Sequence, residues 1–140
     1  MIEGVCILSS ILSLYEAVRE KLGAEYTDIK YNTMKSDVEG QVGVYLYEGA
    51  ADIQNLDDVE FENIKIQVQV NAYKSEAGIR NALDYLRAFV DRIEYENSAI
   101  EGIEFISAIH TGPKAIPIGK NEFGIMVCKS TVELSYTLDD

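Results

Sequence analysis

The stretch ENIKIQVQVNAYKSEAGIRNALDYLRAFVDRIE, residues 62–94, contains the two most regular patterns in the chain. From Ile64 to Ala72 apolar and polar side chains alternate, a period typical of a strand with one buried and one polar face. Ser75 is then predicted as an N-cap, followed by the acid Glu76 in the first turn. Apolar side chains follow at helical spacing, namely Ile79, Ala82, Leu83, Leu86, Phe89, Val90 and Ile93. The sequence therefore predicts a half-buried strand followed by an amphipathic helix of about five turns.

This predicted helix depends on docking rather than on its surface charges. Its outer face carries opposite charges at i,i+4 spacing, each pair contributing only a few tenths of a kcal/mol. These pairs are Glu76/Arg80, Arg80/Asp84 and Arg87/Asp91. Full burial of one large apolar side chain contributes roughly 1.5–3 kcal/mol. We therefore expect the helix to pack on the apolar face of the preceding strand.

Further elements are predicted on both sides of this unit. A wide apolar stripe over residues 3–22, followed by Gly23 as a C-cap, predicts a first helix. Alternation over Val42–Tyr47 predicts a strand, and residues 103–109 and 123–138 predict two more. The resulting order is helix, strand, strand, helix, strand, strand. We predict one α+β domain over residues 1–140, with a mostly antiparallel sheet and two helices packed on it.

The segments between these elements are predicted to be connections. Residues 24–41 are mixed and polar, with a short strand allowed at Ile29–Asn32, and residues 48–60 have no sustained period. The segment TGPKAIPIGKN, residues 111–121, contains both prolines of the chain. Because proline cannot donate a backbone hydrogen bond, we predict a loop or extended arm there. Its apolar residues, which have no obvious place in the core, are Ala115, Ile116 and Ile118.

Charge and the N-terminal sequence exclude several kinds of partner. The chain has 24 acidic and 12 basic residues, a formal net charge of -12 and a pI near 4.4. Since affinity for phosphates depends on clustered Lys and Arg, we expect no specific nucleic-acid binding. Glu3 stands where an export signal carries bases, and serines interrupt the apolar run. We therefore expect neither an export signal nor a membrane span.

No residue pattern indicates catalysis, a cofactor or a metal. Cys6 and Cys128 lack a second Cys or His at ligand spacing, so we expect buried free thiols, as in a reducing cytoplasm. The single His110 has no identifiable nucleophile or carboxylate partner, and we expect a surface or capping role. The acidic connection at residues 48–60 lacks the oxygen spacing, the central glycine and the final glutamate of a calcium-binding loop. Its aspartates are Asp52, Asp57 and Asp58. We expect a protein that is not an enzyme.

Tyrosine usage points to contacts. The chain has nine Tyr, four Phe and no Trp. Tyrosine is favoured where the ring is buried and the hydroxyl contacts solvent, as at subunit contacts. An equally weighted alternative is that Tyr45, Tyr47 and Tyr73 merely coat the polar face of the sheet.

Three stretches together resemble a known family. They are ENIKIQVQVNAYKSEAGIRNALDYLRAF (residues 62–89), AIPIGKNEFG (residues 115–124) and the closing alternation up to Tyr136. In pattern and order they resemble the tail terminator proteins of long-tailed bacteriophages, also described as minor capsid or tail completion proteins. The resemblance implies an α+β subunit of a ring, commonly a hexamer, at the head-proximal end of the tail tube. Such a ring stops tube polymerisation and joins the filled head.

The resemblance also implies partners, a location and contact residues. The partners would be further copies of the chain, the tail tube protein and head–tail connector proteins, first in the host cytoplasm and then in the virion. We expect the ring or tail contacts at Pro113, Ile116, Pro117, Ile118 and Phe123. Acids repeated around a ring would repel DNA from the lumen, and the candidates are Asp52, Asp57, Asp58, Glu60 and Glu62. The alternatives are another head–tail connector (neck) protein, or a cytoplasmic α+β protein that binds a small ligand.

Overall fold

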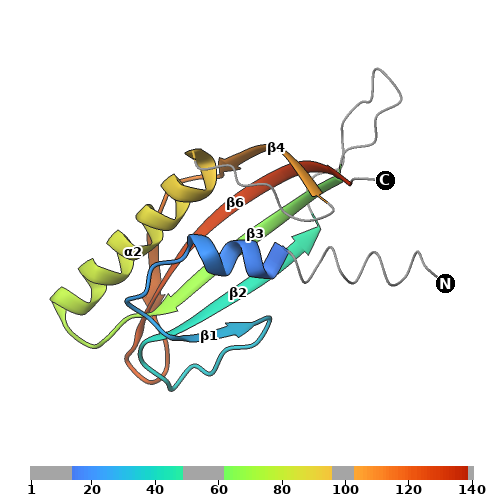
Figure 1. Ribbon diagram of the computed structural model, residues 1–140. Coiled ribbons are helices and arrows are strands. Elements are labelled where there is room, and N and C mark those ends of the chain that lie inside the picture. Colours follow the sequence, from blue (N-terminus) through green and yellow to red (C-terminus); the bar gives the residue numbers. More distant parts are fainter. Residues whose placement is uncertain (1–13, 49–61, 96–102, 139–140) are drawn as a thin grey trace.

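The protein is an α+β structure with one mixed sheet and helices on one of its faces (Figure 1). The computed structural model describes residues 14–48, 62–95 and 103–138. Its strands are β1 (Asp28–Tyr31), β2 (Gln41–Glu48), β3 (Glu62–Asn71), β4 (Ile103–His110), β5 (Ile116–Lys120) and β6 (Met126–Leu138). The helices are residues 14–21 and α2 (Glu76–Tyr95).

The strand order in the sheet is β1-β2-β3-β6-β4, and β5 also pairs with β6. The pairs are antiparallel except β1 with β2, which is parallel. The prediction of a mostly antiparallel α+β sheet is therefore confirmed in outline, although the sheet is mixed and contains more strands than predicted. β4 pairs with residues 132–138 of β6 and β5 with residues 126–129, so both strands line the same edge of β6.

The central strand and helix form as predicted because their patterns are local. In β3 the side chains of Ile66, Val68 and Val70 are fully buried, and they face the helices. Ser75 Oγ accepts a hydrogen bond from the backbone N of Gly78 at 2.8 Å, which confirms the N-cap of α2.

The predicted ion pairs on α2 were wrong in their partners. Asp84 pairs with Arg87 at i,i+3, and Asp91 pairs with Lys114 in the segment before β5. Both pairs are exposed, so they contribute little to the stability of the helix. Docking of its apolar face holds α2 in place.

The first helix ends at residue 21, close to the predicted end at residue 22. The start of this prediction and Cys6 lie outside the described residues. Gly23 was predicted as the C-cap, and it lacks the positive φ common at that position. Leu14 and Val18 are buried in the same core as α2. Cys128 is a buried free thiol, and its burial raises the pKa of the thiol.

Residues 111–121 were predicted to form a loop or an extended arm; residues 116–120 are extended, but they form strand β5 of the sheet. Among the described strands β5 pairs with β6 alone, so one backbone edge of β5 has no partner strand. Pro117 is tolerated because a residue whose backbone nitrogen faces that edge needs no N–H donor. The pairing shifts register between Pro117 and Gly119, and Gly119 has a φ of 146°. Ala115, predicted to lie outside the core, is buried within it.

Gln41 joins β1, β2 and the connection between them. Its side chain, 2% exposed, donates Nε2 to Asp28 Oδ2 at 3.0 Å and accepts at Oε1 from the backbone N of Lys35 at 2.6 Å. The hydrogen bond from Gln41 is the largest cause that holds the pKa of the Asp28 carboxyl below its ordinary value.

We expect Gln41→Leu to lower the free energy of unfolding by about 1 kcal/mol at neutral pH, since leucine cannot accept from the Lys35 amide. Asp28 also loses its donor. A depressed folded-state pKa stabilises the fold above the unfolded-state pKa, and this contribution is lost as the pH falls through the folded-state value. The wild-type advantage in urea unfolding should therefore shrink at acidic pH, and Asp28→Asn should remove that pH dependence. A pH-independent advantage would contradict this explanation.

Candidate functional site

The first candidate surface, which we name the edge patch, consists of Ile116, Pro117, Ile118 and Phe123. All four side chains are exposed; the exposed fractions are 38% for Ile116, 54% for Ile118 and 45% for Phe123. Pro113, the fifth predicted contact residue, is also exposed. The patch lies along β5, whose outer backbone edge has no partner strand among the described residues. An exposed strand edge with large apolar side chains is a surface suited to pairing with another chain.

The turn after β5 holds Phe123 outward. Asn121 Oδ1 accepts from the backbone N of Phe123 at 2.9 Å and of Ile125 at 3.2 Å. The backbone N of Gly124, which has a φ of 76°, donates to the Asn121 carbonyl at 3.0 Å. Asn121 Nδ2 donates to the Ser36 carbonyl at 2.7 Å. Phe123, predicted to begin the last strand, therefore belongs to a fixed turn that presents its ring to solvent.

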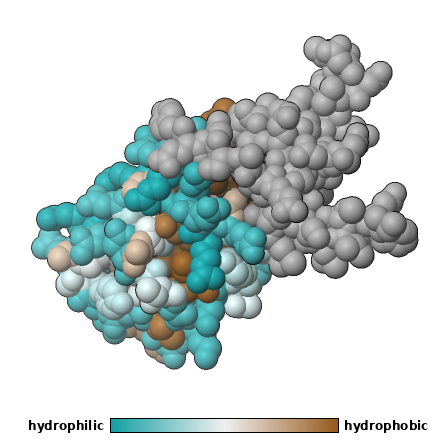
Figure 2. All heavy atoms as spheres, in the orientation of Figure 1, coloured by the Kyte–Doolittle hydropathy of each residue, from teal (hydrophilic) through white to brown (hydrophobic). Residues whose placement is uncertain are grey.

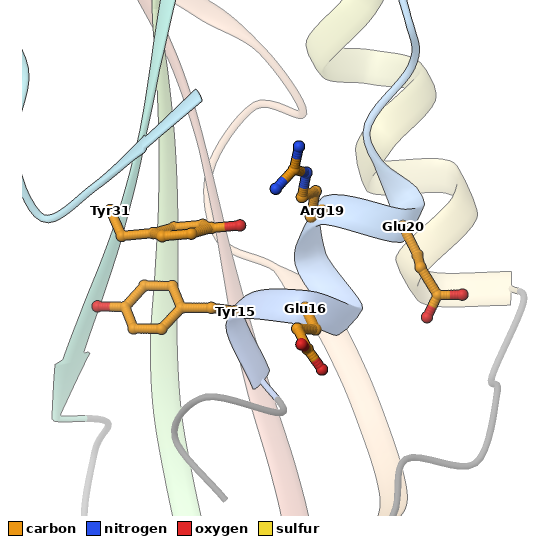
Figure 3. Close-up of a pocket in the computed structure, with 5 residues that line it drawn as sticks. All are labelled: Tyr15, Glu16, Arg19, Glu20 and Tyr31. Carbon is orange, nitrogen blue, oxygen red and sulfur yellow. The ribbon is translucent and has the colours of Figure 1, made fainter. Parts of the chain in front are cut away.

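The second candidate surface, the tyrosine cavity, lies at the opposite edge of the sheet, where the helix of residues 14–21 meets β1. It has a volume of about 630 Å³ and is lined by Tyr15, Glu16, Arg19, Glu20 and Tyr31. Figure 3 shows the rings of Tyr15 and Tyr31 one above the other, with Glu16 and Glu20 projecting from the helix away from both rings. The ring centroids are 4.6 Å apart at an interplanar angle of 46°.

Asn32 fixes the position of Tyr15. Its Nδ2 donates to the Tyr15 hydroxyl, and Asn32 itself has a φ of 60°, a left-handed conformation that asparagine tolerates better than most residues. Burial is the largest cause that raises the pKa of Tyr15, against the opposite effect of the Asn32 hydrogen bond. The cavity therefore has an aromatic wall, formed by the neutral Tyr15 and by Tyr31, and a charged rim formed by Glu16, Arg19 and Glu20.

His110 has a carboxylate partner that the sequence could not identify. Glu94 Oε2 accepts from the backbone N of His110 at 2.6 Å and lies 2.6 Å from its Nδ1. The Glu94 side chain is 9% exposed and the His110 side chain 32%. The pair ties the last turn of α2 to the end of β4, which is a structural role.

Two of the three tyrosines expected to cover the polar face of the sheet lie on that face. Tyr45 and Tyr47 lie opposite Gln67 and Lys65 on the face without helices, and their rings stack at 6.3 Å. Tyr73 does not lie on this face, because it follows β3 and stacks on Tyr26. The prediction that these tyrosines cover the polar face of the sheet is therefore confirmed for Tyr45 and Tyr47 and wrong for Tyr73.

Four of the five predicted lumen acids lie where the structure gives no description. Asp52, Asp57, Asp58 and Glu60 lie outside the described residues, and Glu62 is the first residue of β3. That these acids line a lumen stays a prediction. Figure 2 shows that the described part of the helix-bearing face is mainly hydrophilic, with apolar atoms visible in small groups.

No protein-family model matches the chain, and no curated protein matches its sequence. Within residues 14–48, 62–95 and 103–138, no group of three or more His, Cys, Asp or Glu side chains could hold a metal ion. In the same part of the chain, none of the helices combines the length and the apolar character needed to cross a membrane.

Proposed function

We propose that this chain is a structural subunit of a phage tail terminator ring, which ends the tail tube and joins the tail to the head. One observation supports this most: the two candidate surfaces are unlike each other and lie on opposite edges of one sheet. The edge patch follows β5 beside β6, and the tyrosine cavity lies beside β1. Unlike surfaces on opposite sides of a subunit form head-to-tail contacts, and such contacts close into rings.

In this proposal the edge patch of one copy docks at the β1 edge of the next. Ile118 and Phe123 would lose their exposure to water there, and each large apolar side chain contributes roughly 1.5–3 kcal/mol when fully buried. Association itself costs on the order of 4–15 kcal/mol, so one anchor is insufficient and the whole patch has to take part. The tail tube protein and a head–tail connector protein would cover the two faces of the ring.

The acidity of the chain fits a ring around passing DNA. Phosphates are repelled by carboxylates over about a Debye length, roughly 8 Å at physiological salt. We propose that Asp52, Asp57, Asp58, Glu60 and Glu62 line the lumen and keep it from binding the genome. A neck connector ring would use the same principles, and flanking genes for portal, tail tube and tape measure proteins would favour the tail terminator.

The test is a mixing experiment with one-sided variants. We expect Ile118→Asp combined with Phe123→Asp to remove the patch, and Tyr31→Ser to open the wall of the cavity. Each variant alone should give monomers in light scattering where the wild type forms oligomers, with a loss of affinity of about 100-fold or more. A mixture of the two should give dimers but no rings, because each copy keeps one intact surface.

Tyr47→Asp is the matched control, since Tyr47 is 47% exposed but lies on the open sheet face. It should leave assembly unchanged. Circular dichroism melting must show that all three variants remain folded. A wild-type protein that stays monomeric at high concentration and on tail tubes, or a control that disrupts assembly equally, would contradict the proposal.

A further inference from the structure

A second pocket lies away from both candidate surfaces, between α2, the segment after the first helix and the segment after β3. Its volume is about 280 Å³. Three tyrosines, Tyr26, Tyr73 and Tyr85, supply aromatic surface, and the polar lining residues include Glu25, Asn81 and Asp84. This site could not be predicted from the sequence, because the three tyrosines belong to three separate segments and share no local spacing.

Tyr26 is the centre of the aromatic cluster. Its ring stacks on Tyr73 with centroids 6.2 Å apart and planes 13° apart, and it meets Tyr85 edge-on at 4.6 Å and 76°. Tyr26 and Tyr85 are 5% and 4% exposed, whereas Tyr73 is 53% exposed. The pocket therefore has a buried aromatic floor and one accessible ring at its mouth.

Two of the lining residues lie close against glycines. A Cβ at Gly40, which has a φ of 76°, would overlap the Tyr73 hydroxyl, and a Cβ at Gly78 would overlap the Tyr73 carbonyl. A Cβ at Gly23 would overlap the carboxylate of Glu25. The Tyr73 backbone therefore requires glycine at position 78, and the side-chain ends of Tyr73 and Glu25 lie close to Gly40 and Gly23.

The Tyr85 hydroxyl has an unmet hydrogen-bonding capacity. It is buried and has no hydrogen-bond partner within the described part of the chain. Burial is the main cause that raises its pKa, the neighbouring Glu25 carboxylate and Tyr26 add to the rise, and the charge of Arg92 opposes it. The hydroxyl is therefore neutral and has oxygen lone pairs available to a donor, and a buried polar group without a partner calls for an explanation.

We propose that this pocket binds a guanidinium group. A guanidinium is planar, stacks on aromatic rings and carries five N–H donors, which suits the tyrosine faces, the Tyr85 hydroxyl and the carboxylates of Glu25 and Asp84. An ammonium is more strongly hydrated and cannot stack, and an anion would meet two carboxylates. Asp84 is available because its pair with Arg87, at 3.3 Å, is an exposed one of low strength.

The chain's own Arg92 does not take this place. Its Nη1 donates to the Lys21 carbonyl at 3.0 Å, and Arg92 is not among the lining residues. A guanidinium could come from an arginine side chain of another protein chain or from a free small compound. The site is independent of the ring proposal, since it shares no residue with the edge patch or the tyrosine cavity.

The test uses N-acetyl-arginine amide, with N-acetyl-citrulline amide as its neutral isostere and N-acetyl-lysine amide as the ammonium probe. We expect the arginine probe to give saturable NMR shifts of the Tyr26, Tyr73 and Tyr85 ring signals, with a millimolar dissociation constant. The lysine probe should bind more weakly, by about threefold or more, and citrulline by about tenfold or more. If agmatine binds more tightly than N-acetyl-arginine amide, the natural guanidinium comes from a free small compound. If N-acetyl-arginine amide binds more tightly, the guanidinium comes from an arginine side chain of another protein.

Variants separate binding from folding. Tyr85→Phe removes one hydroxyl and should weaken the arginine probe by about three- to tenfold while leaving the melting temperature unchanged or higher, since no partner is lost. Glu25→Gln should weaken it by a similar factor, and Glu122→Gln, an exposed acid in the β5–β6 turn, should not. Citrulline binding as tightly as arginine, full affinity in both pocket variants, or no saturable shift at tens of millimolar probe would each overturn the proposal.

Discussion

Phe89→Ala is expected to lower the free energy of unfolding by about 3–5 kcal/mol, the range for truncating a buried phenylalanine. The Phe89 side chain is fully buried and lies in the core with Leu86 and Val68. Its removal loses apolar burial and leaves a cavity that the sheet cannot close, because β6, on which α2 mainly packs, is paired on both sides. Since domains are stable by only about 5–15 kcal/mol in total, urea unfolding should show a much earlier midpoint.

Phe123→Ala is the matched control, because it deletes the same ring from an exposed turn. Phe123 is 45% exposed, and the bonds that hold its turn come from Asn121. We expect its free energy of unfolding to stay within about 0.5 kcal/mol of the wild type. Equal losses for the two variants would mean that α2 does not dock through Phe89.

The elements that could be predicted are those whose pattern and partner lie close together in the sequence. Alternation gave β3, and the helical stripe and N-cap gave α2, because each is decided within one short window. The packing of α2 on the sheet was also predicted, but its main partners are β6 and β4, and it contacts the preceding strand β3 less. β2 and β6 were predicted for the same reason, with ends that differ by a few residues.

The errors come from interactions between distant segments. β5 was missed because the rule against proline in sheets applies to interior strands, and nothing local showed that residues 116–120 pair along the edge of β6. The parallel pairing of β1 with β2 depends on how the chain between them turns back. Likewise, Glu94 meets His110 only through the docking of α2 beside β4.

The candidate surfaces show the same division. The sequence indicated Ile116 and Ile118 as residues without a place in the core, and both are exposed. It could not find the cluster of Tyr26, Tyr73 and Tyr85, which forms only when three segments meet. Polarity alone is also an incomplete guide, because Asn71 continues the polar face of β3 and is nevertheless buried.

Asn71 fastens the connection between β1 and β2 to the sheet. Its side chain is 2% exposed, and Nδ2 donates to the carbonyl oxygens of Lys35 and Val38, each at 2.9 Å. Its own carbonyl accepts from the backbone N of Gly40 at 2.7 Å. Gly40 in turn packs against the Tyr73 hydroxyl, so Asn71 also supports one wall of the guanidinium pocket.

Asn71→Leu is therefore expected to lower the free energy of unfolding by about 2–4 kcal/mol, because two carbonyl groups lose their donor and each costs about 1–3 kcal/mol if left without one. The released connection should also exchange its amide hydrogens faster and weaken binding of N-acetyl-arginine amide. Gln69→Leu is the control on the same strand face: Gln69 is half-buried, its Nε2 donates to Gln67, and its loss should cost about 0.5 kcal/mol or less. If both leucine variants unfold at the same urea concentration, the bonds to Lys35 and Val38 do not hold the connection.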